Sequence, residues 1–203
     1  MLKDEALKEF FNYFVNKACV DFIYNRYSDY YGGKDLYPKD ASGDRLTITL
    51  EAILPGSSKN TIYDNDGVSL KSLKMIQNGK VVNLWGSNQK SQYLHLPVNG
   101  KYQNFIVEPG TSNETDLTGK PYLEIVSLSD FNVDLLTGDF GSEIRFAYYH
   151  TKKGHIIPLT GGSLVGNIEE CLPTIRLSQK QINLNNVKIP SYALLDKISV
   201  FNK

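Results

Sequence analysis

The feature that most constrains this chain is a stretch between residues 136 and 175 that reads as two strands joined by a short turn. Residues 143–149 alternate between apolar and polar side chains, which predicts a β-strand with two different faces. The polar segment 151–154 ends in glycine, and residues 155–157 begin a return strand. Pro158 lacks a backbone N–H, so we expect it at a sheet edge or at the end of this strand.

The same stretch continues with a glycine break and a predicted helix. Gly161 and Gly162 interrupt the strand pattern, and residues 163–172 are expected to open a short helix. Pro173 lies too late to disturb the interior of that helix.

The clearest helix lies at the N-terminal end, over residues 4–18. Apolar residues recur there at spacings of three and four and form one broad face, while Asp4 and Glu5 complement the helix dipole at its start. Residues 20–44 are rich in Tyr, Asp and Gly. We expect a loop or short strand pair there, in preference to a sugar- or peptide-binding surface.

Strands dominate the rest of the chain. The hairpin signal is strongest at Asn78-Gly79, which favours a type I′ turn between strands 70–76 and 80–82. Further strands are expected at residues 46–50, 105–107, 122–128, 182–184, 187–189 and 192–200. The pattern predicts an α+β fold with one long N-terminal helix and one or two short helices. Its sheet should be mainly antiparallel, and either curved or partly closed like a barrel.

Composition excludes several classes of protein. Lys plus Arg and Asp plus Glu both total 22, so no net field favours nucleic acid or a membrane surface. No apolar run approaches the length of a membrane span, and the charged start does not resemble a signal peptide. Cys19 and Cys171 are expected to be free thiols in a reducing cytoplasm.

Few residues are arranged for chemistry. The acidic segment 64–67 resembles the start of a calcium loop, but Met75 stands where the bidentate Glu belongs, so we expect a simple turn. The glycine cluster 161–166 lacks the lysine of a phosphate-binding loop, and the sequence contains no GxSxG motif. Catalytic residues are therefore not predicted.

The three histidines leave one metal site open as an alternative. If residues 151–154 form the loop, His150 and His155 face each other across two strands, and His95 or Cys171 would be a third ligand. A cross-strand pair beside an exposed turn explains the same residues and is strongly favoured, because no Glu lies at a motif spacing to either histidine.

Several motifs, in this order, resemble the C-terminal domain of the TldD/PmbA family, whose members include modulators of DNA gyrase and zinc peptidases. The motifs are the acidic turn 64–68, the hairpin tip 77–81, the strand end 105–110, TGDF at 137–140, GGSLVGN at 161–167 and the closing strand 190–200. The resemblance covers residues 45–203, and the helix within residues 1–20 is expected to continue it. It implies a single domain over 1–203 and a role in peptide processing or proteolysis.

The resemblance does not extend to the family's zinc ligands. The zinc-bearing branch has two histidines on one helix, in an HExxxH-type arrangement, and a cysteine much further on. Helix 4–18 contains no histidine, and residues 187–190 contain no cysteine. The chain therefore resembles the metal-free PmbA/TldE-like branch, which implies no zinc cofactor here. Family members usually carry a further N-terminal domain.

The expected function is that of a non-catalytic component. The implied partner is a homologous zinc-bearing TldD-like chain or a second copy of this one, and the implied ligand is an extended peptide. Two alternatives stay open: a metal-dependent peptidase with its site relocated to His150 and His155, or a purely structural interaction domain.

Overall fold

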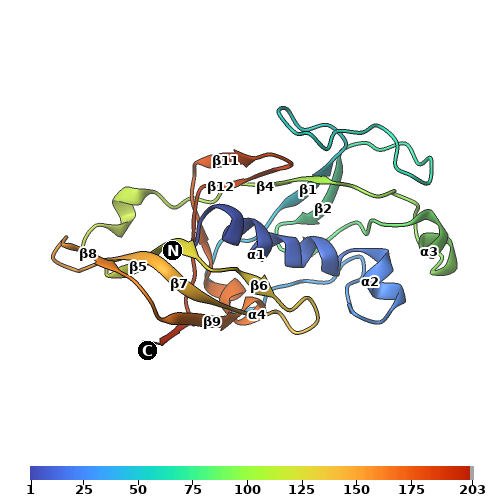
Figure 1. Cartoon of the computed structure of the whole chain (residues 1–203). Helices are drawn as coiled ribbons and strands as arrows, with labels where there is room; N and C mark the ends of the chain where they lie inside the picture. Colours follow the sequence, from blue (N-terminus) through green and yellow to red (C-terminus); the bar gives the residue numbers. More distant parts are fainter. Residues whose placement is uncertain (202–203) are drawn as a thin grey trace.

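A long helix lies between two sheets in this computed structural model, which describes residues 1–201 without the side chains of Glu114 and Asp116. The helix, α1 (Asp4–Lys17), crosses the middle of Figure 1, and its bounds agree with the predicted helix to one residue. Leu7, Phe10 and Phe11 are fully inaccessible to solvent. The broad apolar face of the sequence is thus part of the core.

The first sheet has six strands in the order β11-β12-β4-β1-β2-β3. They are β1 (Ile48–Glu51), β2 (Leu73–Gln77), β3 (Lys80–Val81), β4 (Asn104–Val107), β11 (Gln181–Leu184) and β12 (Val187–Pro190). Only the β4–β12 pair is parallel. Asn78 and Gly79 have φ values of 47° and 77°, as a type I′ turn requires, so the predicted β2–β3 hairpin is confirmed.

The second sheet is built around one long strand, β7 (Asp139–His150), which pairs with four others. Its remaining strands are β5 (Tyr122–Leu128), β6 (Asn132–Val133), β8 (Ile156–Leu159), β9 (Ser163–Asn167) and β14 (Ser199–Phe201). Neither sheet closes into a barrel in the described part of the chain. The α+β fold and the mainly antiparallel sheets are confirmed.

The first two residues connect the second sheet to a small two-stranded sheet of β10 (Arg176–Leu177) and β13 (Ala193–Leu194). Leu2 forms an antiparallel bridge with Ala193. The Met1 amine donates to the Leu123 carbonyl at 2.6 Å, and the Ile125 N–H donates back to the Met1 carbonyl at 3.1 Å. The outer edge of β5 is therefore covered.

The predicted helix over residues 163–172 is only half right. Its first half is strand β9, and helix begins later as α4 (Ile168–Cys171), followed by a 3₁₀ turn at Leu172–Thr174. In β9, Leu164 is buried and Val165 is exposed, which is a strand pattern. The Asn167 side chain accepts hydrogen bonds from the N–H groups of Glu169 and Glu170 and caps α4 there.

Two other expectations need correction. The single closing strand over residues 192–200 is two short strands in different sheets, because the chain turns at Lys197, whose φ is 58°. Residues 20–44 include a short helix, α2 (Val20–Tyr24), where a loop or strand pair was expected. A further short helix, α3 (Asn88–Tyr93), lies in the polar excursion before β4.

No helix among the described residues has the length and apolar character to cross a membrane.

Candidate functional site

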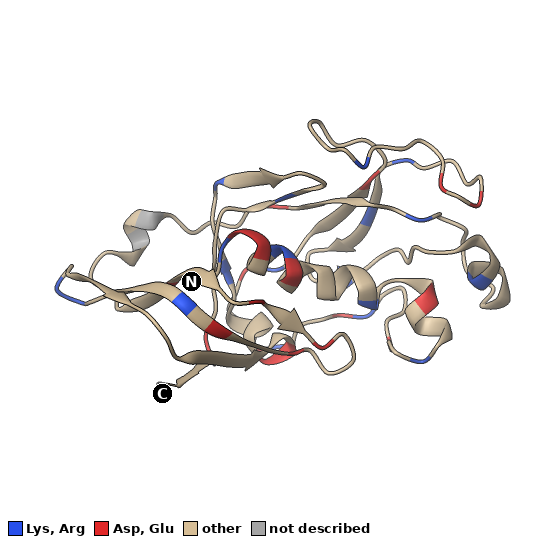
Figure 2. Ribbon diagram, viewed as in Figure 1, with Lys and Arg blue, Asp and Glu red and all other residues tan. Residues whose placement is uncertain are grey.

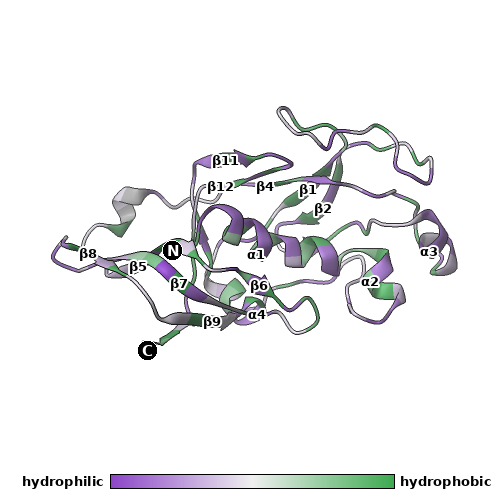
Figure 3. Cartoon of the chain, in the orientation of Figure 1, coloured by the Kyte–Doolittle hydropathy of each residue, from purple (hydrophilic) through white to green (hydrophobic). Residues whose placement is uncertain are grey.

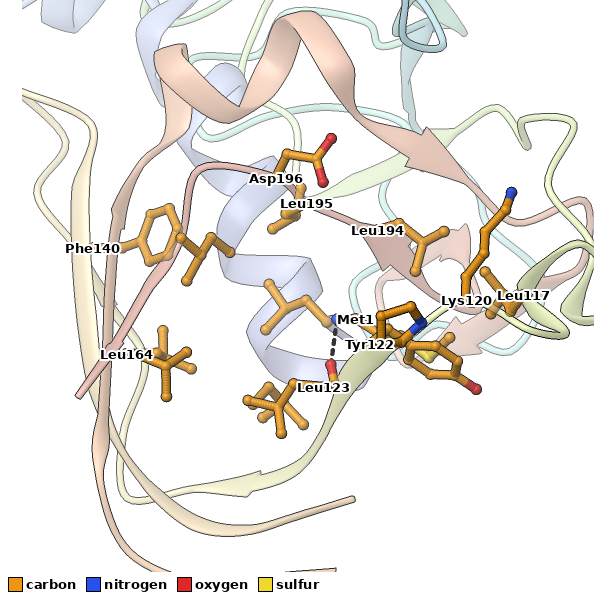
Figure 4. A pocket seen from close by; sticks show the side chains of 15 residues that line it. Met1, Leu117, Lys120, Tyr122, Leu123, Phe140, Leu164, Leu194, Leu195 and Asp196 are labelled. Atoms are coloured by element: carbon orange, nitrogen blue, oxygen red, sulfur yellow. Dashed lines mark hydrogen bonds between the residues drawn. The ribbon is translucent and has the colours of Figure 1, made fainter. Parts of the chain in front are cut away.

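An apolar cavity of about 340 Å³ lies beside β5, where β5, β9, β14 and the first two residues meet (Figure 4). Its apolar walls include Leu2, Leu123, Ile125, Phe140, Leu164 and Val200. Three polar side chains complete it: Lys120, Tyr122 and Asp196. Cavities of this size and composition are typical binding sites for small ligands or for a side chain of a partner.

His150 belongs to a polar cluster on the same strand pair. Its ring stacks on Tyr122, with centroids 4.2 Å apart, and its Nε2 lies 2.8 Å from Glu124 Oε2. The Lys3 ammonium donates to the other oxygen of Glu124. Burial opposes ionisation of Glu124, but the hydrogen bonds from Lys3 and His150 outweigh it and hold the pKa of this carboxyl below its ordinary value.

This shift predicts a specific pH dependence. A depressed pKa in the folded state gives stability that is complete above the pKa of the unfolded carboxyl and is lost as the pH falls through the folded value. In Glu124→Gln, we expect the free energy of unfolding to fall less steeply with acidity below about pH 4. Urea unfolding from about pH 3 to pH 6 measures this slope.

Lys3→Met provides the matched comparison, because it removes one of the two donors to Glu124 and keeps His150. The pH dependence of its free energy of unfolding should be intermediate between that of the parent protein and that of Glu124→Gln. Identical slopes in all three proteins would contradict the assignment.

The register of the β7–β8 hairpin separates His150 from His155. The loop has three residues, since Thr151 N–H donates to the His155 carbonyl and Gly154, at φ 81°, takes the left-handed position. His150 therefore lies opposite Ile156, not His155. A shift of one residue places the two histidines on opposite faces, so the expected cross-strand pair is not formed.

The other residues weighed as metal ligands are also dispersed. His95 follows α3 and adopts φ 55°, and Cys171 in α4 is buried, with its thiol donating to the Asp196 carbonyl. Burial raises the pKa of the Cys171 thiol to about 11. Among the described residues, no three His, Cys, Asp or Glu side chains form a group that could hold a metal ion.

Helix α1 and residues 187–190 are the two segments where the family resemblance led us to look for zinc ligands, and both present apolar side chains to the core. On α1, residues one turn apart on the inner face are Phe10 and Phe14, both buried in the core. On β12, the buried side chains are Val187, Ile189 and Pro190. None of these supplies a nitrogen or sulfur ligand.

The acidic segment 64–67 is a turn, as predicted. The Asp64 side chain accepts hydrogen bonds from the backbone N–H groups of Asp66 and Val68 at 2.9 Å each, and from Lys101 N–H at 2.9 Å. These contacts use the carboxylate to fix the backbone, as in an Asx turn.

One edge of the second sheet is open and apolar. All four residues of β8 are exposed, and β8 pairs only with β7. Pro158 lies opposite Tyr148. Thr151 and His155 form a hydrogen-bonded pair, and every second residue pair from there along the hairpin is also hydrogen-bonded. The pair of Tyr148 and Pro158 is one of the others, so the backbone nitrogen of Pro158 points away from β7. Pro158 is on an edge strand, as predicted, and it removes one donor from the open edge.

Comparison with protein-family models identifies one family. The model of the PmbA/TldA metallopeptidase C-terminal domain matches residues 1–202. A search of curated proteins finds no match.

Three solved structures share the fold. TldE from Thermococcus kodakarensis is 15% identical with a TM-score of 0.72, covering 93% of this chain and 46% of that one. A Thermotoga maritima protein described as a modulator of a DNA gyrase is 14% identical with a TM-score of 0.79, covering 98% and 48%. A similarly described Bacteroides thetaiotaomicron protein is 17% identical with a TM-score of 0.71, covering 96% and 45%.

The chain thus spans less than half the length of these three structures. Because the family model matches nearly every residue, the chain belongs to the TldD/PmbA family, as a C-terminal domain of the metallopeptidase-related type.

Proposed function

We propose that this chain is a non-catalytic component of peptide or protein processing and that it acts with a partner chain. The observation that carries the proposal is the combination of the family's fold with a helix α1 whose inner face holds Phe10 and Phe14. Catalysis would then belong to a homologous, zinc-bearing partner, and this chain would contribute binding surface.

The physical contribution of such a subunit is to hold an extended peptide or a partner's segment. Open sheet edges bind extended chains through backbone hydrogen bonds, and β11 and β14 end their sheets in the described structure. We place this activity in the cytoplasm, where the buried free thiols of Cys19 and Cys171 stay reduced.

Native mass spectrometry of the tagged protein, purified gently from its own cells, tests the proposal. We expect a complex with a homologous chain that carries one zinc ion, while this chain, separated from its partner, carries none. Isolation of this chain alone with one tightly held zinc ion would overturn the proposal.

The alternative of a relocated metal site has its own test. It requires that the His150→Ala, His155→Ala protein lose both zinc and hydrolytic activity. The structure gives this alternative no support, because the two rings lie on opposite faces and His150 contacts Glu124.

A further inference from the structure

The second sheet extends beyond the core as a β arm, which we define as β5, residues 144–150 of β7, and β8. The arm projects to the left of Figure 1. Residues paired across neighbouring strands share a face of the sheet. Leu123, Tyr149 and Ile157 form one such row, and Ile125, Ala147 and Leu159 form the next.

These two rows connect the cavity to solvent. At their inner ends, Leu123 and Ile125 line the cavity of Figure 4. At their outer ends, Tyr149, Ile157 and Leu159 are 38%, 44% and 41% exposed. The face that packs in the core thus continues outward as an exposed apolar strip. Figure 3 shows hydrophobic colour also on β9, whose Leu164 lines the same cavity.

A continuous apolar surface with a cavity at one end is a feature of interaction sites. Isolated exposed apolar residues are ordinary on protein surfaces, but a contiguous strip is not. A cavity beside such a strip receives an anchoring side chain, which then supplies most of the binding energy.

Lysine side chains lie at both ends of this surface. Lys152 and Lys153 form the tip of the arm, coloured blue at the far left of Figure 2, and Lys120 lines the cavity. None of the three ammonium groups forms an ion pair with a side chain that the structure describes. Asp196, at the cavity, is the acid among its lining residues, and Glu124 is bound to Lys3 and His150.

We propose that the cavity and the apolar strip of the arm bind a segment of a partner protein that has a large apolar anchor residue flanked by acidic residues. The anchor enters the cavity between Leu123 and Leu164, and the acidic residues lie near Lys120, Lys152 and Lys153. The inference deepens the proposed function, on which it rests, by naming the surface and the chemistry of the partner.

The arm binds this segment through its face and not through its edge. Pro158 removes a donor from the outer edge of β8, which disfavours the addition of another strand there. The side chains of Tyr149, Ile157 and Leu159 are unaffected by Pro158 and remain available.

Selection from a random dodecapeptide library displayed on phage tests the proposal without knowledge of the partner. The intact protein should enrich peptides with Phe, Leu or Trp next to Asp or Glu. In fluorescence polarisation, Leu159→Glu should weaken binding of an enriched peptide by about tenfold or more. Lys152→Glu, Lys153→Glu should weaken it and reduce its salt dependence, and this variant alters only an exposed turn.

Val165→Glu is the matched control, because Val165 is 42% exposed on the same sheet but lies next to Leu164 in sequence and so faces away from the cavity. It should bind the peptide like the parent. The proposal is overturned by a selection without enrichment, by enriched basic peptides, or by equal binding to Leu159→Glu and Val165→Glu. It is also overturned if Leu159→Glu dissociates a homodimer, since the occupant would then be a second copy.

These results are separable from those of the proposed function. Enriched acidic peptides without a homologous zinc-bearing partner in cells would leave the surface assignment intact and remove the proposed function. If Leu159→Glu still bound the homologous partner chain, the proposed function would stand and the surface assignment would fall.

Discussion

Replacing Phe10 by alanine is expected to lower the free energy of unfolding by about 3–5 kcal/mol, the usual range for a buried phenylalanine. Phe10 is fully inaccessible, and its ring lies 5.7 Å from Phe11, 6.0 Å from Phe14 and 6.4 Å from Phe140, measured between centroids. Phe140 is on β7, so the truncation removes contacts that join α1 to the second sheet. Chemical denaturation monitored by circular dichroism measures the loss.

Phe201→Ala is the matched control, since it removes the same side chain from a position that is 57% exposed on β14. Its effect should stay within about 0.5 kcal/mol of zero. If the two alanine variants lost equal stability, α1 would not be packed between the sheets as described.

Gly43→Ala is expected to destabilise the protein by about 1–3 kcal/mol through overpacking. A Cβ atom at this position would lie 2.6 Å from the Ile175 carbonyl oxygen and 2.7 Å from the Ile175 nitrogen. These are backbone atoms, and the two segments are held together by hydrogen bonds from Gly43 N–H to the Pro173 carbonyl and from Asp44 N–H to the Ile175 carbonyl. Neither segment can move aside without breaking them.

Gly32→Ala separates this clash from the general effect of removing a glycine. A Cβ atom at Gly32 would meet no atom within 4 Å, so the change should be neutral or slightly stabilising through the unfolded chain. Thermal unfolding of the two variants compares them directly. A loss in Gly32→Ala as large as that in Gly43→Ala would contradict the close approach of residues 43 and 175.

Local sequence signals predicted the elements whose structure depends on local physics. Asn78-Gly79 determined a two-residue turn because both positions need positive φ, and residues 122–128 include the β-favouring residues Tyr122, Ile125 and Val126 in the strand that they form. The 3.6-residue period over residues 4–18 was long enough to give helix α1 almost to the residue. These signals do not depend on the rest of the chain.

Features that depend on pairing between distant segments were not predicted. Residues 163–167 were assigned to a helix, but they form β9 because Asp139 to Glu143 of β7 are available to pair with them. The predicted pairing of His150 with His155 was wrong because the loop has three residues and not four. The register of the hairpin is therefore shifted by one position. In both cases tertiary contacts or turn geometry outweighed local propensity.

The candidate site could not be predicted from the sequence either. Its walls come from Leu2, from β5, from β9 and from β14, which no spacing rule connects. Gly161 and Gly162 correctly predicted a break in the strand pattern, between β8 and β9, but gave no indication of a cavity.

The bridge between Leu2 and Ala193 has a consequence for synthesis on the ribosome. Helix α1 is synthesised before the segment around Ala193, so its surroundings are complete only when that segment has also left the exit tunnel. At about 5–20 residues per second, this delay lasts on the order of 10–40 seconds. During that time Phe10, Phe11 and Phe14 stay exposed on a nascent amphipathic helix, which is the kind of segment that chaperones bind.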